Sequence, residues 1–137
     1  MEKYTIVVNG VVFDKELNKI LIIKRKEGLQ KGKWAFPGGK LENETILEGL
    51  KREIKEEVNL DIENKKEYIA DYQYKREDGS LSLGLSFLVF AKNEDICKNE
   101  EIEDFKWVIR EDLINYDLVE GLEEEALIAF QKVENGI

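Results

Sequence analysis

The chain has no histidine, a single cysteine, a single proline and no long apolar run, and each scarcity argues against a class of protein. With no histidine, and with Cys97 as the only thiol, it lacks the nitrogen and sulfur ligands of ordinary zinc sites. One cysteine cannot form an intrachain disulfide. No stretch approaches the roughly 20 apolar residues that span a bilayer, and the opening MEKYTIVVNG lacks the apolar core of a signal peptide. We therefore expect a cytoplasmic protein with no membrane partner.

Basic residues are also fewer than acidic ones. Lysine and arginine number 21 against 30 aspartates and glutamates, which gives a net charge of −9. DNA and RNA are usually bound by a basic face, so this balance argues against a nucleic-acid polymer as partner. A small anionic substrate that arrives with its own metal ion remains compatible. At 137 residues, the chain is expected to form one domain spanning residues 1–137.

The chain does contain a cluster of acidic residues directly after a Gly-Gly turn, in the segment FPGGKLENETILEGLKREIKEEVNLDI of residues 36–62. The spacing of its apolar residues predicts an amphipathic helix over residues 45–58 that ends at Asn59, a residue that tolerates the left-handed conformation. Glu53 and Glu57 fall on the edge of the apolar stripe, and Glu56 lies further round. Three carboxylates therefore share one neighbourhood.

These carboxylates predict a metal site. Like charges three and four residues apart cost a helix about 0.2–0.5 kcal/mol per pair, and a hard divalent cation would reverse that cost. Mg²⁺ prefers oxygen ligands, which this chain supplies in quantity. Gly49 costs about 1 kcal/mol inside a helix, so we expect it to leave room for a ligand beside the acids. The alternative is a solvated acidic face, the usual role of a lone Glu-Glu pair.

Apolar periodicity outlines the remaining elements. Strands are predicted at residues 4–13 and 19–24, a hairpin at 67–76 and 81–91 around Asp78-Gly79, and a short strand at 105–109. In the second hairpin strand, alternation of large apolar residues with Ser82, Gly84 and Ser86 predicts that the large residues form the buried face. Helices follow at 111–116 and 120–133. The order predicts an α/β fold with helices on both faces of a mixed sheet.

At this point the residues resemble the Nudix hydrolases, whose box reads G-x5-E-x7-R-E-U-x-E-E-x-G-U, with U a bulky aliphatic residue. The chain matches the box in order at Gly38, Glu44, Arg52, Glu53, Ile54, Glu56, Glu57 and Leu60. It departs from the family pattern at Asn59, which replaces a glycine, and in the GGKLENET loop, which is one residue shorter than the usual family wording. The resemblance implies an α/β/α sandwich, dependence on Mg²⁺ or Mn²⁺, and hydrolysis of a nucleoside diphosphate linked to another group. Dimers are common in the family.

The resemblance also assigns roles by box position. Glu56 and Glu57 are expected to be metal ligands, and Glu53 a ligand or the general base. The resemblance implies that the carbonyl of Gly38 or Gly39 is a further ligand. Arg52 is expected to orient a carboxylate by pairing with Glu48 or Glu56, one helical turn away.

A further acid usually precedes the late tryptophan, here Trp107. Its spacing from that residue favours Glu101 as a metal ligand over Glu100 and Glu103. Arg25, Gly39 and Lys40 are expected to contact substrate phosphates, since arginine can grip phosphate with two hydrogen bonds. The alternative for each of the basic residues is a plain surface charge. Tyr72, Tyr74 and Phe87 are candidates to stack a base, although strand aromatics more often belong to the core.

The substrate prediction rests on context. Pro37 is the only proline, so the downstream proline that marks the ADP-ribose subfamily is absent. Small members with an FPGGK segment look most like the MutT-like enzymes, which convert a nucleoside triphosphate to a monophosphate and pyrophosphate. The alternatives are a pyrophosphatase for ADP-ribose, nucleotide sugars or dinucleotides, and a Nudix-fold nucleotide sensor without catalysis.

Overall fold

The computed structural model describes residues 4–28, 30–76 and 78–137. The strands are β1 (Tyr4–Phe13), β2 (Ile20–Arg25), β3 (Trp34–Ala35), β4 (Gly38–Lys40), β5 (Glu67–Lys75), β6 (Leu81–Phe90) and β7 (Ile102–Val108). The helices are α1 (Ile46–Val58), the 3₁₀ helix η1 (Arg110–Asn115) and α2 (Leu122–Glu134).

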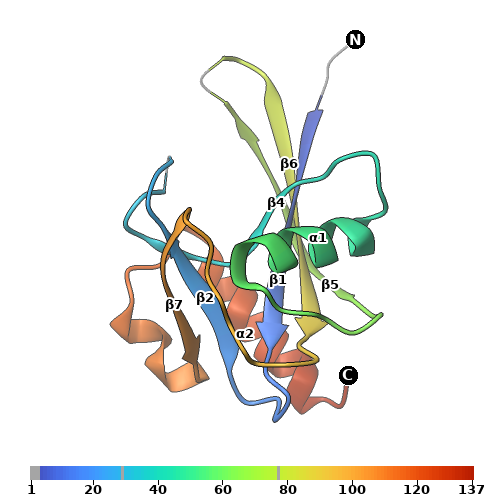
Figure 1. Ribbon diagram of the computed structural model, residues 1–137, viewed down its shortest axis with the longest axis vertical. Coiled ribbons are helices and arrows are strands. Elements are labelled where there is room, and N and C mark those ends of the chain that lie inside the picture. The colour runs from blue at the N-terminus through green and yellow to red at the C-terminus, as the bar shows by residue number, and fades with distance from the viewer. Residues whose placement is uncertain (1–3, 29, 77) are drawn as a thin grey trace.

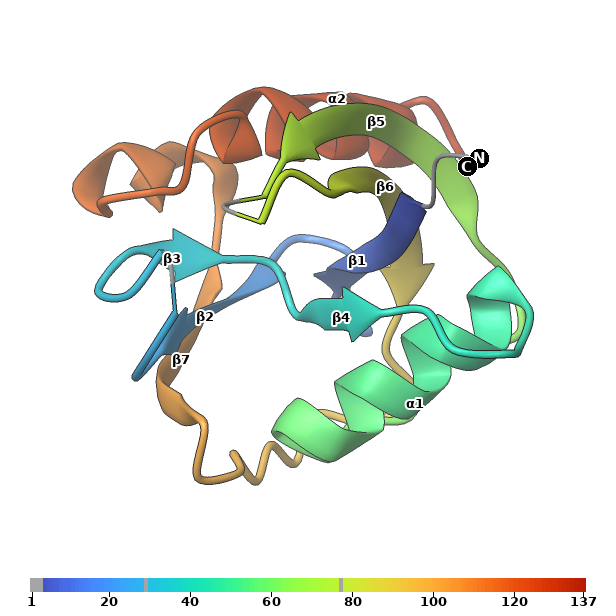
Figure 2. The same ribbon diagram turned by 90° about the horizontal axis from the view of Figure 1, so that it is seen from above.

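The strands form one mixed sheet. Its order is β3-β2-β1-β6-β5, with β4 added to β1 and β7 added to β2. β1 and β6 run parallel along their whole length, from Tyr4 opposite Leu81 to Phe13 opposite Phe90, and the other pairs are antiparallel. α1 covers one face, while α2 and η1 cover the other (Figures 1 and 2). The predicted α/β/α sandwich around a mixed sheet is confirmed.

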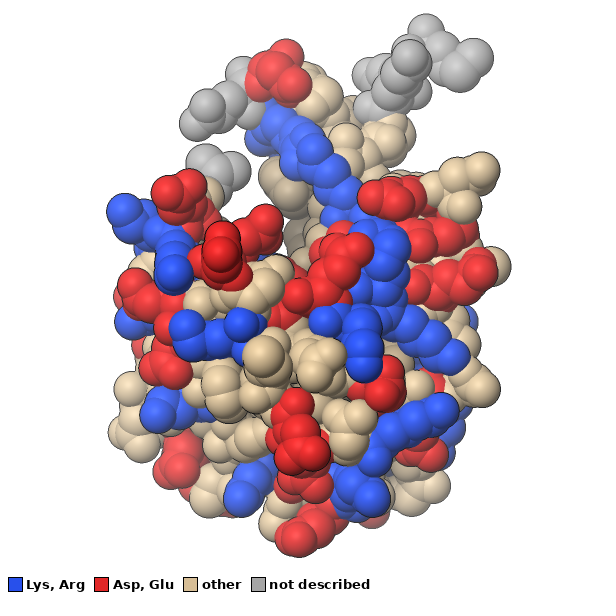
Figure 3. Space-filling view, in the orientation of Figure 1, with Lys and Arg blue, Asp and Glu red and all other residues tan. Residues whose placement is uncertain are grey.

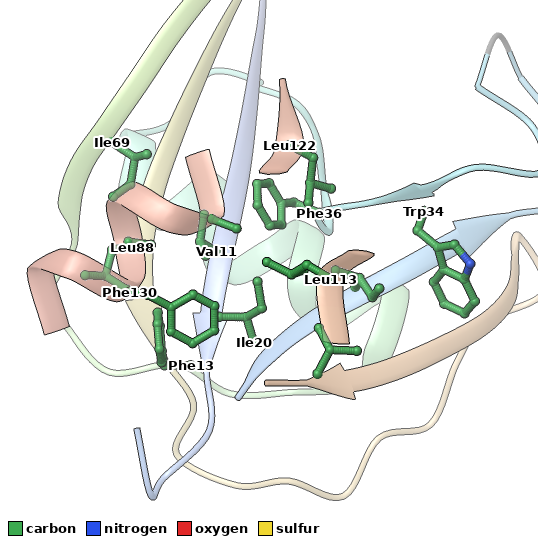
Figure 4. Close-up of a cluster of buried hydrophobic side chains, with 14 of the residues drawn as sticks. Val11, Phe13, Ile20, Trp34, Phe36, Ile69, Leu88, Leu113, Leu122 and Phe130 are labelled. Carbon is green, nitrogen blue, oxygen red and sulfur yellow. The ribbon is translucent and has the colours of Figure 1, made fainter. Parts of the chain in front are cut away.

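Alternating residues of β1 feed two hydrophobic cores. Phe13 packs edge-on against Phe130 of α2, with ring centroids 5.1 Å apart, in the core shown in Figure 4. Val8 and Val12 point to the opposite face and pack against Leu50 and other apolar residues of α1. Each helix is therefore fixed to β1 by buried apolar surface, which is the main stabilising contribution of such layers.

Local signals set both ends of α1. Thr45 is the N-cap: its hydroxyl accepts a hydrogen bond from Glu48 N, and its own backbone N–H donates to the Glu48 carboxylate, which completes a capping box. Asn59 follows the last helical residue with φ 60°, in the left-handed region, and donates its N–H to Lys55 O. The predicted helix and its end at Asn59 are confirmed.

The burial expected for the second hairpin strand is right only in its second half, where Phe87 and Val89 are buried. Ser82, Gly84 and Ser86 are the buried residues in the first part of β6, whereas Leu81, Leu83 and Leu85 are half-buried, and Leu85 packs against the core on the α1 side. The reason is the partner strand. Tyr72 of β5 lies opposite Gly84, and a Cβ at Gly84 would sit 2.0 Å from the tyrosine ring, so the small residues make room for a large neighbour.

Smaller differences concern boundaries. β7 begins at Ile102, three residues earlier than predicted, because its acidic residues pair with β2 although they interrupt the apolar run. The helix predicted at 111–116 is the 3₁₀ helix η1. β3 and β4 were not predicted as strands, since each is only two or three residues long and exists through pairing with a distant strand.

In the part of the chain that the structure describes, no helix is long and apolar enough to cross a membrane. On the face that carries α1, acidic and basic side chains are interspersed (Figure 3).

Candidate active site

β4 brings the Gly-Gly turn against β1 on one side and α1 on the other (Figure 2). Gly38 pairs with Asn9 of β1 so closely that a Cβ there would lie 2.1 Å from Val8 O. Only a residue without a side chain fits at this point. The peptide groups of Gly38 are thereby held next to the acidic helix.

Glu57 is the carboxylate most firmly fixed. It is 4% exposed, its Oε1 accepts a hydrogen bond of 2.9 Å from Gly38 N, and its Oε2 accepts one of 2.9 Å from Arg25 Nη2. Burial raises the pKa of the Glu57 carboxyl, and the nearby charge of Glu53 adds to this, while the Arg25 charge and the Gly38 N–H oppose it. Glu57 therefore lies inside the protein with one cation beside it, and it is not a solvated surface acid.

Arg52 joins a second group of acids. Its guanidinium donates to Glu44 from Nε at 3.0 Å and from Nη2 at 2.6 Å, and to Glu53 Oε1 from Nη1 at 2.8 Å. Nη2 also donates to Lys40 O at 3.0 Å. The Arg52 hydrogen bonds lower the pKa of Glu44, and the Glu44 hydrogen bonds raise the pKa of Arg52. Arg52 thus ties Glu53 to β4 and to the loop before α1.

The predicted partners of Arg52 were only partly right. Glu56 Oε1 lies 3.6 Å from Nη1, but Glu48 is occupied in the capping box with Thr45. The stronger partner, Glu44, lies eight residues back in the loop, where helical spacing gives no indication of it.

Glu53 lies directly over Gly39. A Cβ at Gly39 would sit 2.4 Å from Glu53 Oε2 and 2.5 Å from its Cδ. The absence of a side chain at Gly39 is therefore what allows the Glu53 carboxylate to approach the β4 backbone.

The expectation that Gly49 leaves room for a ligand is wrong. Gly49 is buried, and a Cβ there would lie 2.5 Å from Leu41 Cδ1 and 3.3 Å from Glu44 Oε2. The space beside Gly49 is filled by the loop that carries Glu44. Gly49 lets that loop pack on α1, which helps to place Glu44 next to Arg52.

The structure does not bring all the predicted ligands together. Glu56 is exposed, and so is Glu101, whose backbone O accepts the Lys26 N–H. Within residues 4–28, 30–76 and 78–137, no three acidic or cysteine side chains form a metal-binding group. The physical reason is that two carboxylates are held by separate arginines, Glu53 by Arg52 and Glu57 by Arg25.

The oxygen atoms of this site nevertheless suit a hard divalent cation as ligands. Gly38 O and Glu57 Oε2 both accept a hydrogen bond from the same nitrogen, Nη2 of Arg25, at 3.0 and 2.9 Å. A backbone carbonyl and a carboxylate thus already converge on one cationic group. Because all these candidate ligand atoms are oxygens, they match the preference of Mg²⁺ or Mn²⁺.

A cavity of about 780 Å³ lies beside this site. Arg25, Gly38 and Gly39 form the wall that it shares with the acidic residues. Further lining comes from β1, β5, the segment before β4 and the start of α2, and includes Asn9, Phe36, Tyr72, Tyr74, Leu122 and Glu125. This volume is typical of small-molecule sites, which measure about 300–1,000 Å³.

Comparisons with known proteins show the family of this chain. The profile described as the NUDIX domain matches residues 3–129. The chain belongs to the Nudix family and is a Nudix hydrolase.

Two curated relatives are similar in sequence. This Nudix hydrolase is 35% identical over 102 residues to the nucleoside triphosphatase NudI of Klebsiella pneumoniae subsp. pneumoniae, covering 66% of this chain and 71% of the relative. It is 36% identical over 114 residues to the 8-oxo-dGTP diphosphatase of Buchnera aphidicola subsp. Schizaphis graminum, covering 81% and 82%.

Among solved structures, the NUDIX domain of Shewanella oneidensis NrtR, complexed with ADP ribose, superposes with a TM-score of 0.79 over 97% of this chain and 90% of the other. The two sequences are 16% identical, so this similarity shows the fold alone.

The aromatic candidates divide between the two faces of this Nudix sheet. Tyr72 and Tyr74 line the cavity, with rings stacked at 6.1 Å and 18°, and Asn9 Nδ2 donates a hydrogen bond of 2.7 Å to the Tyr72 hydroxyl. Phe87 is buried in the α1 core. Lys40 is exposed, and only its backbone O takes part in the Arg52 network.

Asn9 and Glu125 are among the cavity residues of the Nudix hydrolase that sequence reasoning missed. Asn9 is a polar residue inside the apolar strand TIVVNGVVF, which was an available signal. Glu125 is half-buried at the cavity, and burial raises the pKa of its carboxyl. Nothing in the run Glu123-Glu124-Glu125 distinguishes it from its exposed neighbours, because the distinction depends on how α2 meets the sheet.

Proposed function

We propose that this Nudix hydrolase converts a nucleoside triphosphate to a nucleoside monophosphate and pyrophosphate with Mg²⁺ or Mn²⁺. The observation that carries the proposal is that the cavity and the acidic helix share one wall, formed by Arg25, Gly38 and Gly39. A nucleoside bound in the cavity would therefore extend its phosphates to the carboxylates. The names of the two curated relatives, a nucleoside triphosphatase and an 8-oxo-dGTP diphosphatase, support this substrate class.

The metal would be held by oxygens of this site. We assign Glu53, Glu56, Glu57 and Gly38 O as ligands, with Glu101 supplied by the neighbouring loop, whose Asn99 N–H bonds Glu57 O. When bound, Mg²⁺ neutralises phosphate oxygens and lowers the pKa of a coordinated water.

The remaining residues orient these ligands and the substrate. Arg52 fixes the Glu53 carboxylate against β4, whether Glu53 serves as a ligand or as the general base. Gly39 and Arg25 line the cavity wall where the phosphates would lie, and Arg25 and Lys40 would supply positive charge to phosphate oxygens. Glu120 and Glu125 line the cavity at the start of α2, where their charge disfavours phosphate. The polyphosphate is therefore directed to the Arg25 side, and the base to Phe36, Tyr72 and Tyr74.

The test is a panel of nucleoside triphosphates, ADP-ribose, dinucleoside polyphosphates and NADH, with the released phosphate species identified. We expect pyrophosphate and a nucleoside monophosphate in the presence of Mg²⁺. Glu57→Gln is the matched control, because it keeps the shape of the side chain and removes its charge. Release of orthophosphate in place of pyrophosphate, or turnover of ADP-ribose alone, would contradict the proposal.

The same panel separates the alternatives. A nucleotide sensor would bind members of the panel without turnover, although all the box carboxylates that catalysis needs are present. We also propose that residues 1–137 act as one domain in the cytoplasm. Association as a homodimer stays a prediction that light scattering would test.

A further inference from the structure

Arg25 makes contacts that its proposed role in phosphate binding does not require. Its Nη2 donates to Gly38 O at 3.0 Å and to Glu57 Oε2 at 2.9 Å, in a part-buried position at the end of β2. These two oxygens belong to the residues assigned above as metal ligands. The guanidinium therefore interacts with the same pair of atoms that the divalent cation would use.

Two cations that approach this pair of oxygens from the same side compete for it. The Arg25 guanidinium stays charged at all working pH values, so its interaction with the two oxygens cannot be weakened by loss of a proton. Mg²⁺ binds oxygen at about 2.0–2.1 Å, a shorter distance than the 3.0 and 2.9 Å hydrogen bonds that Nη2 makes to these oxygens. A metal ion that binds Gly38 O and Glu57 Oε2 from the side that Arg25 now occupies would therefore displace its guanidinium.

A displaced Arg25 has a place to go. The side chain is 31% exposed and also lines the cavity, so it can turn from the two oxygens toward the cavity without breaking the hydrophobic core. In the cavity the guanidinium would meet the phosphates of a bound nucleotide, with which it can form two parallel hydrogen bonds. One side chain thus has two alternative anionic partners.

We propose that Arg25 is an exchangeable internal cation, which holds Gly38 O and Glu57 until a divalent metal takes them and then binds the substrate phosphates. Arg25 is then a positioning residue that couples metal binding to nucleotide binding. The inference rests on the proposed metal site. The inference predicts that loss of the Arg25 charge strengthens metal binding, because a competitor for the two oxygens is removed. If Arg25 only supported the site, its loss would weaken metal binding.

The experiment measures Mn²⁺ affinity by electron paramagnetic resonance, without nucleotide, for wild type, Arg25→Ala and Arg25→Gln. Both neutral variants should bind Mn²⁺ at least about fivefold more tightly, the lower end of ordinary coupling between two sites. Arg25→Lys keeps the charge and should stay close to wild type. Lys24→Ala removes a positive charge from the neighbouring residue, which pairs with Glu103, and serves as the matched control with unchanged affinity.

Thermal unfolding provides an independent readout. In EDTA, the neutral variants should melt below wild type, because Glu57 then stays buried without a counter-ion. Excess Mn²⁺ should raise their melting temperatures by more than it raises that of wild type, since tighter binding stabilises more. Under Mn²⁺, the same variants should bind a methylene-bridged nucleoside triphosphate more weakly than wild type.

Mn²⁺ affinity of the neutral variants that equals or falls below that of wild type would overturn the inference. So would an Arg25→Lys protein that binds Mn²⁺ as tightly as Arg25→Ala. If wild type binds no Mn²⁺, the proposed metal site fails, and this inference fails with it. Hydrolysis by wild type, together with unaltered Mn²⁺ affinity in the variants, would refute the role of Arg25 alone.

Discussion

Replacing Gly39 by alanine tests whether the Glu53 carboxylate must lie against β4. The new Cβ would meet Glu53 Oε2 at 2.4 Å, about 1 Å closer than an ordinary contact, and it would leave the sheet pairing in place. The carboxylate is the end of a flexible side chain, so it should swing away from Gly39 and lose its 2.8 Å bond to Arg52 Nη1.

The cost to stability should be modest. A strained rotamer costs about 0.5–1.5 kcal/mol, and the lost ion pair adds little because both partners are partly exposed. We therefore expect a loss of roughly 1–2 kcal/mol in the free energy of unfolding. The cost to catalysis should be larger, since a misplacement of about 1 Å at a catalytic group can reduce the rate about 10²-fold.

The assay combines denaturant unfolding with kcat/KM for wild type, Gly39→Ala, Glu53→Gln and the double variant. If Gly39→Ala acts through Glu53, it should reduce activity strongly in the wild-type background and hardly at all in the Glu53→Gln background. If the double variant instead lost kcat/KM by the product of the two single losses, the reasoning would be refuted, because the alanine would then act independently of Glu53. Gly38→Ala provides the contrast, since its Cβ would strike Val8 O and should destabilise the fold itself.

Four further outcomes are expected. Glu57→Gln should reduce turnover at least about 10²-fold with the fold intact by circular dichroism, and activity within a few-fold of wild type would restore the view of a solvated helix. EDTA should abolish activity and Mg²⁺ or Mn²⁺ should restore it, whereas full activity in excess chelator would exclude the metal site. Gly49→Leu should lower the melting temperature because its side chain would collide with Leu41, and an unchanged melting temperature would mean that the loop yields freely. Burial raises the pKa of Glu125, so the folded state binds more protons than the unfolded state just above pH 4.5, and stability falls as pH rises through the raised pKa. Glu125→Gln should therefore raise the melting temperature at pH 8 but not at pH 4, whereas the exposed Glu124→Gln should change little at either pH.

The features that sequence reasoning predicted correctly are those set by neighbouring residues. The helix over residues 46–58 follows from apolar spacing, and its end follows from the conformational preference of Asn59. The order of the box also placed Glu53 and Glu57 on that helix. Both features depend on contacts within one or two turns, so an amphipathic pattern is enough to specify them.

The features that were missed depend on contacts between distant segments. The space beside Gly49 is filled by Leu41, which the path of the loop determines. The buried face of β6 depends on the ring of Tyr72 across the strand pair. The pairing of Arg25 with Glu57 spans 32 positions, and no local period can report it. These contacts decide which side of an element faces the site, and they exist only after the sheet has formed.

The parallel pairing of β1 with β6 has a consequence for biosynthesis. β1 is made first, but its partner is complete only when Phe90 has left the ribosome, so the centre of the sheet closes late. Contacts of such long sequence separation slow folding, and until they form, β1 exposes an unpaired edge to other chains. β4, which carries the Gly-Gly turn, pairs with this same strand. The sheet that holds β4 should therefore be complete only after most of the chain has been synthesised, which pulse proteolysis of stalled ribosome complexes can time.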